Sequence, residues 1–166
     1  FSHVGGFGIR AAKLGAKKVV MVDASDSALA LAKEIAQANA VSERCEFIRD
    51  DVMEWLPEHR AHYDLIVCDP PALIKNRSAM ANGIRAYTSL NRRAMHHLKR
   101  DGMLLTFSCS QLLQRPMFLQ MLRDAARNEP LFLHSEWKQA PDHPILLAHP
   151  ETEYLKGAML VQSLMS

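Results

Sequence analysis

Cysteine is scarce in this sequence, which has only Cys45, Cys68 and Cys109 among 166 residues. An odd number of cysteines without paired spacing argues against a disulfide framework and is typical of a reducing cytoplasm. Long apolar runs are also missing: none approaches the roughly 18 residues that a membrane span requires, and no signal peptide is visible. We therefore expect a cytoplasmic protein with no membrane partner.

Net charge is low as well, because 20 Lys and Arg residues against 18 Asp and Glu residues give a formal charge of +2. This value is too small to indicate nucleic-acid binding by itself. The length suits one domain, over residues 1–166, with a sizeable core. The chain opens inside a glycine-rich motif, so we interpret it as a fragment whose first strand is truncated.

Short apolar runs alternate with amphipathic segments over the first three quarters of the chain. Strands are predicted over 19–22, 45–48, 63–68 and 103–107, and helices over 9–14, 28–36, 53–56, 84–98 and 116–126. This alternation predicts an α/β fold with a doubly wound, Rossmann-like sheet. The strand-like runs 131–134 and 155–161 have no helical pattern between them, which predicts a C-terminal antiparallel hairpin.

Three of the predicted strand ends carry residues suited to a nucleoside ligand. The segment Gly5-Gly6-Phe7-Gly8 lets the backbone turn tightly and approach a ligand, although its spacing is not the dinucleotide fingerprint. Asp23 can accept hydrogen bonds from both ribose hydroxyls, and Asp50 or Asp51 ends the next strand, where the same crevice would hold an adenine. Any one of these acids can instead be a helix cap. Their succession favours a ligand site.

Two further strand ends carry chemistry of another kind. Asp69-Pro70-Pro71 leaves its strand rigidly and frees carbonyls and a carboxylate for a planar polar edge such as that of a nucleobase, or is only a proline-rich exit. Cys109 ends the next strand between two serines, where partial exposure would suit a nucleophilic thiol, with an inert cysteine as the alternative. Asp69 and Cys109 are expected side by side because neighbouring parallel strands end at one edge. Cys45 and Cys68 are expected to be structural.

The segments that carry this pattern are Phe1–Gly8, Val22–Ser25, Arg49–Val52, Val67–Pro71, Phe107–Ser110, Asp142–Pro144, His149–Glu151 and Tyr154–Gly157. Together, in this order and spacing, they resemble the class I S-adenosylmethionine-dependent methyltransferases that make 5-methylcytosine in large-subunit ribosomal RNA (rRNA). The resemblance covers essentially the whole chain. In that family, RNA-binding domains lie upstream of the catalytic domain, and they are absent here.

The resemblance implies S-adenosylmethionine as cofactor, with S-adenosylhomocysteine as its product, large-subunit rRNA as partner, and no metal. By the family pattern, Ser2, Gly5 and Gly6 would line the methionine end of the cofactor. Asp23 would bind the ribose, and Asp51 with Val52 would flank the adenine. Asp69 and Pro70 would face both the methyl group and the target base. Further candidate cofactor contacts are Phe1, Ala24, Ser25 and Asp50.

The resemblance also makes Cys109 the nucleophile that adds to carbon 6 of cytosine, so that carbon 5 can attack the sulfonium methyl group. Asp69 would stabilise charge at the edge of the base. A base must then remove the carbon 5 proton. Glu151 is the candidate for that step, with His143 and Asp142 as rivals and a plain surface turn as the alternative for Glu151.

Two other functions stay open at this point. One is a methyltransferase that acts on a nitrogen of an RNA base, which needs Asp69 and its prolines but no thiol. The other is a catalytically silent module that binds the cofactor or RNA. The methylated nucleotide is undetermined, and so is the oligomeric state, for which a homodimer is one alternative.

Overall fold

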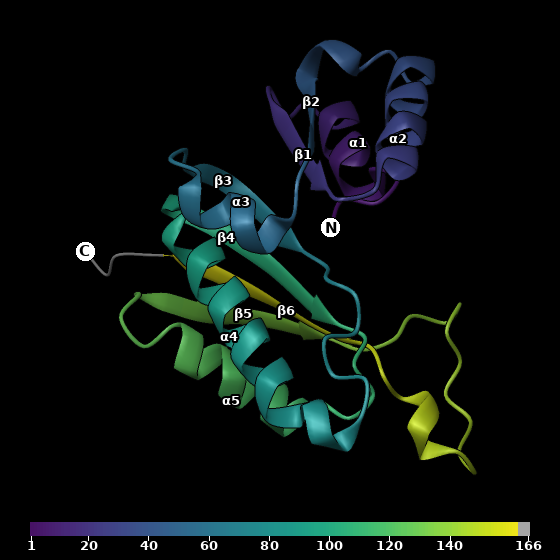
Figure 1. Cartoon of the computed structure of the whole chain (residues 1–166), viewed down its shortest axis with the longest axis vertical. Coiled ribbons are helices and arrows are strands. Elements are labelled where there is room, and N and C mark those ends of the chain that lie inside the picture. The colour runs from purple at the N-terminus through teal and green to yellow at the C-terminus, as the bar shows by residue number, and fades with distance from the viewer. Residues whose placement is uncertain (163–166) are drawn as a thin grey trace. The chain divides into compact units, whose positions relative to one another are not determined.

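The computed structural model describes residues 1–162, and the chain divides into two compact units (Figure 1). The N-terminal unit runs from Phe1 to His59, and the C-terminal unit begins at Arg60. Each unit has its own sheet.

The N-terminal unit contains α1 (Gly6–Lys13), β1 (Val19–Asp23), α2 (Asp26–Ala38), η1 (Ser42–Arg44), β2 (Cys45–Arg49) and α3 (Val52–Glu58). Strands β1 and β2 pair in parallel, with Val19 opposite Cys45 and Asp23 opposite Arg49. The helices bury small and medium apolar side chains against this pair, and the core residues are Ile9, Ala12, Met21, Ala36 and Val41. Parallel pairing across a connecting helix is the arrangement that the sequence pattern predicts.

The C-terminal unit contains β3 (Tyr63–Cys68), η2 (Arg77–Ala79), α4 (Met80–His96), β4 (Leu98–Ser108), α5 (Arg115–Ala125), β5 (Leu131–Trp137), η3 (Pro150–Thr152) and β6 (Lys156–Gln162). Its sheet has the order β3-β4-β6-β5. Strands β3 and β4 are parallel, whereas β6 is antiparallel to both β4 and β5. Figure 1 shows α4 and α5 packed along one face of this sheet. The predicted antiparallel hairpin is confirmed, with β6 inserted between β4 and β5.

Strand register decides which ends meet in the C-terminal unit. Cys68 lies opposite Thr106 in the β3–β4 pair, and Ser108 lies opposite Lys156 in the β4–β6 pair. The residues that follow β3 and β4 therefore emerge at the same edge of the sheet, next to the first residue of β6. This confirms the expectation that the Asp69 and Cys109 segments are neighbours.

Element boundaries differ from the sequence prediction at two places. Helix α4 begins at Met80 instead of residue 84, because Asn76 caps the preceding turn by accepting a hydrogen bond from the Ala79 N–H at 2.9 Å, and the helix continues directly from that turn. Strand β4 begins at Leu98, five residues early, and Gly102 lies within it. A Cβ atom at Gly102 would lie 2.8 Å from the Lys99 carbonyl oxygen, so only glycine fits this close approach.

Two predicted helix starts are resolved by their caps. Ser25 caps α2 by accepting a hydrogen bond from the Ala28 N–H at 3.2 Å, and Asp26 pairs with Arg49 at 2.9 Å. Asp51 caps α3 by accepting from the Met53 N–H at 2.8 Å. Within the described residues, no helix is both long enough and apolar enough to cross a membrane.

Candidate active site

In the N-terminal unit, the ends of β1 and β2 bring several predicted cofactor residues together. The backbone nitrogens of Phe1 and Ser2 donate to the Val22 carbonyl at 2.6 and 2.9 Å. The Asp50 N–H donates to the Asp23 carbonyl at 3.1 Å. The start of the chain and the loops after β1 and β2 are therefore joined by hydrogen bonds around one strand end.

Asp23 is the most firmly held side chain in this group. Its two carboxylate oxygens accept hydrogen bonds from the His3 N–H at 2.8 Å and the Ser25 N–H at 2.9 Å. Burial alone would raise the pKa of Asp23, but the backbone hydrogen bonds from Ser25 and His3, together with the nearby N-terminal amine and the His3 side chain, bring the pKa below its ordinary value. Asp23 is thus ionised at neutral pH, and each oxygen keeps a lone pair for a ligand hydroxyl.

The glycine turn before α1 has room for a ligand. Gly5 has a φ of +81°, and a Cβ atom there would lie 3.0 Å from both Ile9 Cδ1 and Met21 Sδ, so this position requires glycine. A Cβ atom on Gly6 would meet nothing within 4 Å, and no side chain caps the N-terminus of α1. Among the described residues, the buried Ser2 hydroxyl has no hydrogen-bond partner. An open helix N-terminus beside an unsatisfied hydroxyl fits a polar ligand.

The remaining cofactor candidates have local structural roles. Asp50 accepts from the Asp51 N–H at 2.8 Å, and both acids are exposed. Asp51 is a helix cap, as the alternative interpretation held, and its predicted contact with adenine stays a prediction. Ala24 is exposed beside Asp23, and Val52 begins α3.

In the C-terminal unit, the thiol of Cys109 and the Asp69-Pro70-Pro71 segment come together. Cys109 Sγ lies 3.9 Å from the Pro70 carbonyl oxygen, and Cys109 is partly exposed, as predicted. Cys68 is buried, and burial raises its pKa to about 12, which leaves it inert at neutral pH. Cys45 packs at the edge of the core of the N-terminal unit. Of the three cysteines, Cys109 is the one whose surroundings suit chemistry.

A buried network of hydroxyl groups lies beneath the Cys109 loop. Ser108 Oγ donates to the Tyr87 hydroxyl at 3.0 Å, and that hydroxyl lies 2.9 Å from Ser110 Oγ. Ser110 Oγ in turn accepts from the Ile74 N–H at 3.2 Å. The Tyr87 hydroxyl also lies 3.5 Å from the Pro71 carbonyl oxygen. One tyrosine on α4 therefore ties the residues on both sides of Cys109 to the segment that follows Asp69.

Burial raises the pKa of both reactive groups. Burial raises the pKa of Cys109 and the nearby Asp69 carboxylate raises it further, while the Cys109 N–H and the Lys156 ammonium lower it, with a net increase. Asp69 is an exposed residue, yet partial burial of its carboxyl group raises its pKa as well. A site of this kind can hold a protonated carboxyl group, but its thiol needs help to ionise.

Glu151 belongs to a segment that returns to the end of β4. The Gln111 side chain donates to the Glu151 carbonyl at 3.1 Å, two residues beyond Cys109. The Glu151 carboxylate is exposed and pairs with His149 Nδ1 at 3.1 Å. The rivals Asp142 and His143 pair with one another at 3.2 Å and are also exposed. The backbone of Glu151 is thus near the thiol loop, and its role as the base stays a prediction.

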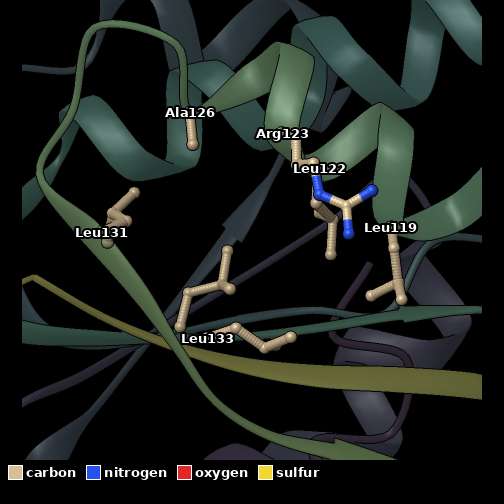
Figure 2. Close-up of a pocket in the computed structure, with 7 residues that line it drawn as sticks. Leu119, Leu122, Arg123, Ala126, Leu131 and Leu133 are labelled. Atoms are coloured by element: carbon tan, nitrogen blue, oxygen red, sulfur yellow. The ribbon is translucent and has the colours of Figure 1, made fainter.

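A separate apolar groove lies between α5 and β5 (Figure 2). Its lining residues are Leu119, Leu122, Arg123, Ala126, Leu131, Leu133 and Leu160. Figure 2 shows leucine side chains from the helix and the strand facing this space, with Arg123 at its side. None of the predicted site residues lines the groove, and its aliphatic walls carry no acid or nucleophile, so it is not a candidate for the reaction.

Sequence reasoning missed two side chains of this site, Tyr87 and Lys156. Lys156 Nζ donates to the Ser110 carbonyl at 3.0 Å and to the Tyr154 carbonyl at 2.7 Å. Lys156 lay within a quoted motif, which was a usable signal, whereas Tyr87 on α4 was indistinguishable from a core residue. A search of the described residues finds no group of three His, Cys, Asp or Glu side chains able to hold a metal ion.

Comparison with known proteins identifies the family of this chain. The family described as "Methyltransferase small domain" matches residues 3–129. The chain belongs to this family. A curated relative, ribosomal RNA large subunit methyltransferase I of Salmonella paratyphi B, is 37% identical over 163 residues, which are 95% of this chain and 40% of that protein. The chain therefore spans well under half the length of this relative.

Solved structures support the same fold. SMU.776, described as a methyltransferase and crystallised with SAH, matches with a TM-score of 0.83 and 19% identity, over 96% of this chain and 43% of that one. TrmN from Thermus thermophilus matches with a TM-score of 0.69 and 21% identity, over 98% and 42%. The predicted Rossmann-like methyltransferase fold is confirmed. At these sequence identities, the two structures support the fold alone.

Proposed function

We propose that the chain is the catalytic part of an S-adenosylmethionine-dependent enzyme that methylates carbon 5 of a cytosine in large-subunit rRNA through a covalent cysteine adduct. The observation that carries this proposal is the partly exposed Cys109 thiol, 3.9 Å from the Pro70 carbonyl oxygen at the strand end that also carries Asp69. The name of the Salmonella relative, a large-subunit rRNA methyltransferase, supports the substrate class.

The end of β1 is the proposed cofactor site, and its residues fit S-adenosylmethionine. When bound, this cofactor supplies an activated methyl group. The ionised Asp23 can accept hydrogen bonds from the ribose hydroxyls. The Ser2 hydroxyl, which has no partner among the described residues, and the start of α1 at Gly6, which no side chain caps, suit the charged methionine end. Asp51 and Val52 would flank the adenine.

Cys109 and Asp69 divide the work on the base. The Cys109 thiolate adds to carbon 6 and forms a sulfur–carbon bond. The base becomes an enamine whose carbon 5 is nucleophilic and able to accept a methyl group. Asp69, when protonated or sharing a proton with the ring, donates a hydrogen bond to the polar edge of the cytosine as charge develops there. A base then takes the carbon 5 proton, the sulfur–carbon bond breaks, and the thiolate leaves. Glu151 is the proposed base, with His143 and Asp142 as rivals.

Substitution of Cys109 in the full-length protein tests this function. With rRNA as substrate, we expect Cys109→Ala to lower the rate of 5-methylcytosine formation by about a thousandfold or more, because the nucleophile is gone. Cys45→Ser is the matched control, since Cys45 lies in the N-terminal unit, and should stay near wild-type activity. Nucleoside mass spectrometry provides the measurement. A Cys109→Ala protein that still makes 5-methylcytosine would overturn the mechanism.

The raised pKa of Cys109 favours one competing function, methylation of a nitrogen on an RNA base, because such an enzyme needs no thiolate. The same mass spectrometry separates the two. Loss of a purine methylation in cells that lack the gene, with 5-methylcytosine unchanged, would support the competing function. Cofactor binding without any methyl transfer to intact rRNA would instead support a catalytically silent module.

A further inference from the structure

Lys156 begins β6 at a position that the strand register fixes beside the thiol loop. It lies opposite Ser108, the residue directly before Cys109. Its Nζ donates to the carbonyl of Ser110, directly after Cys109, at 3.0 Å. The lysine therefore contacts the chain on both sides of the cysteine, through backbone pairing on one side and a side-chain hydrogen bond on the other.

The same ammonium group joins the thiol loop to the C-terminal segment. Lys156 Nζ donates to the Tyr154 carbonyl at 2.7 Å, and the side chain is half-buried. Gln139 in turn holds Tyr154. The Gln139 side-chain oxygen accepts hydrogen bonds from the Tyr154 N–H and, at 2.9 Å, from the Leu155 N–H. Two carbonyl acceptors and a braced loop leave Lys156 little freedom, so its charge has a defined position near Cys109.

The charged groups that act on Cys109 are of opposite sign. Asp69 follows β3 and disfavours the thiolate, whereas Lys156 on β6 favours it. Burial lowers the pKa of Lys156 while Cys109 and Glu153 raise it, with a net decrease. Glu153 is exposed and pairs with Lys138 at 3.6 Å, so part of its negative charge is already balanced. Lys156 is therefore the positive charge set against Asp69 at the thiol.

We propose that Lys156 is a positioning residue for Cys109: its ammonium group fixes the Ser110 carbonyl and stabilises the thiolate against the Asp69 carboxylate. This inference rests on the proposed role of Cys109 as the nucleophile. It adds a part that the reaction needs, because a thiol that is neutral in the resting protein has to ionise before it attacks the base. Lys156 acts through Cys109, and no contact with the substrate is assigned to it.

Thiol alkylation tests this proposal without RNA or cofactor. The full-length protein is treated with iodoacetamide from pH 6 to pH 10, and peptide mass spectrometry follows the modification of Cys109. Since a nearby opposite charge favours the charged form and can shift a pKa by about one unit, we expect Lys156→Met to slow alkylation at pH 7.5 about tenfold and to move its midpoint to higher pH. Lys156→Arg keeps the charge and should stay within about threefold of wild type. Lys99→Met, an exposed lysine paired with Asp64 at the far end of β4, should leave the profile unchanged.

Two results would overturn the proposal. One is a folded Lys156→Met protein whose Cys109 alkylation profile matches wild type, which would leave the lysine with a purely structural role. The other is a Lys156→Arg protein whose Cys109 alkylation is slowed as much as that of a folded Lys156→Gln protein. This second comparison can be made even if Lys156→Met does not fold. The proposed function fails separately: if Lys156 controls alkylation as expected but Cys109→Ala still makes 5-methylcytosine, the thiolate is stabilised but unused.

Discussion

Asp23 and Asp69 are the same residue type at the end of a parallel strand, yet their pKa values move in opposite directions. Asp23 accepts backbone N–H bonds from His3 and Ser25, and these lower its pKa despite partial burial. The pKa of Asp69 is raised by burial. The two backbone donors contribute to this difference, since a carboxylate whose oxygens already accept two amide bonds is stabilised as an anion.

The contrast also separates the proposed tasks of the two units. A fixed anion suits the binding of neutral ribose hydroxyls, because an ionised carboxylate only accepts hydrogen bonds and each hydroxyl can donate one. A carboxyl group that is easily protonated suits a changing charge, because it can donate to the base when negative charge develops there. The following four experiments test this contrast, in order of decreasing expected effect.

Loss of the Asp69 side chain should have the largest effect. We expect Asp69→Ala to lower kcat by about a hundredfold to a thousandfold at saturating cofactor and RNA, as when a single group that stabilises developing charge is removed. Asp64→Ala is the matched control, because Asp64 is exposed on β3 and pairs with Lys99. Single-turnover methylation assays give the measurement. An Asp69→Ala enzyme with wild-type kcat would remove Asp69 from the chemistry.

Loss of the Asp23 charge should weaken binding instead of turnover. We expect Asp23→Asn to raise the Kd for S-adenosylmethionine about tenfold to a hundredfold, since hydrogen bonds to a charged group contribute about 1.5–3 kcal/mol. Asp26→Asn, an exposed acid paired with Arg49, should change the Kd less than about twofold. Calorimetric titration with the cofactor distinguishes them. Equal affinities for wild type and Asp23→Asn would place the ribose elsewhere.

Removal of the single Tyr87 hydroxyl from the hydroxyl network of the C-terminal unit should lower the stability of the protein. We expect Tyr87→Phe to lower the free energy of unfolding by about 1–2 kcal/mol, because the buried hydroxyls of Ser108 and Ser110 lose a partner. Tyr154→Phe, at a partly exposed tyrosine, should cost less than about 0.5 kcal/mol. Urea denaturation of both variants checks this. Equal losses would mean that the network adds no stability of its own.

The opposite pKa shifts predict opposite pH dependences of stability, each within about 1 kcal/mol because solvent screens these groups. The lowered pKa of Asp23 stabilises the fold above pH 4, and this contribution is lost as pH falls through the folded-state value. The raised pKa of Asp69 penalises its ionised form, so that the penalty grows as pH rises from about 4. At pH 7 we expect Asp23→Asn to melt lower than wild type and Asp69→Asn to melt higher. The Asp69 difference should vanish below about pH 4, and the Asp23 difference should shrink as pH falls below about 4. Shifts of the same sign at pH 7 would contradict the contrast.

Much of the fold could be predicted from local pattern. The bounds predicted for β3 match the structure, and β1 and β2 extend one residue past their predicted ends, because apolar runs bounded by turns are visible within a few residues. The start of α4 could not be predicted, since it depends on a capped turn. The full length of β4 could not be predicted either, since it depends on a glycine packed against the Lys99 carbonyl. The position of β6 between β4 and β5 depends on long-range pairing.

The candidate site shows the same division. Cys109 and Asp69 could be chosen from their positions at strand ends, and the expectation that they are neighbours is confirmed. Tyr87 and Lys156 could not be given their roles, because they come from α4 and β6 and reach the thiol loop through hydrogen bonds that cross the sheet edge. The role of Asp51 as a helix cap was one of two alternatives that the sequence left open.

The sequence by itself determined which residues are candidates for the chemistry, because residue type and strand-end position are local properties. It determined the α/β, Rossmann-like fold for the same reason, since apolar runs and amphipathic helical segments alternate along the chain. Only the tertiary structure decided the charge states and the supports. The pKa values of Asp23, Asp69 and Cys109 depend on burial, on backbone donors and on a lysine 47 residues beyond the thiol. Electrostatic energy follows distance in space, and folding sets that distance.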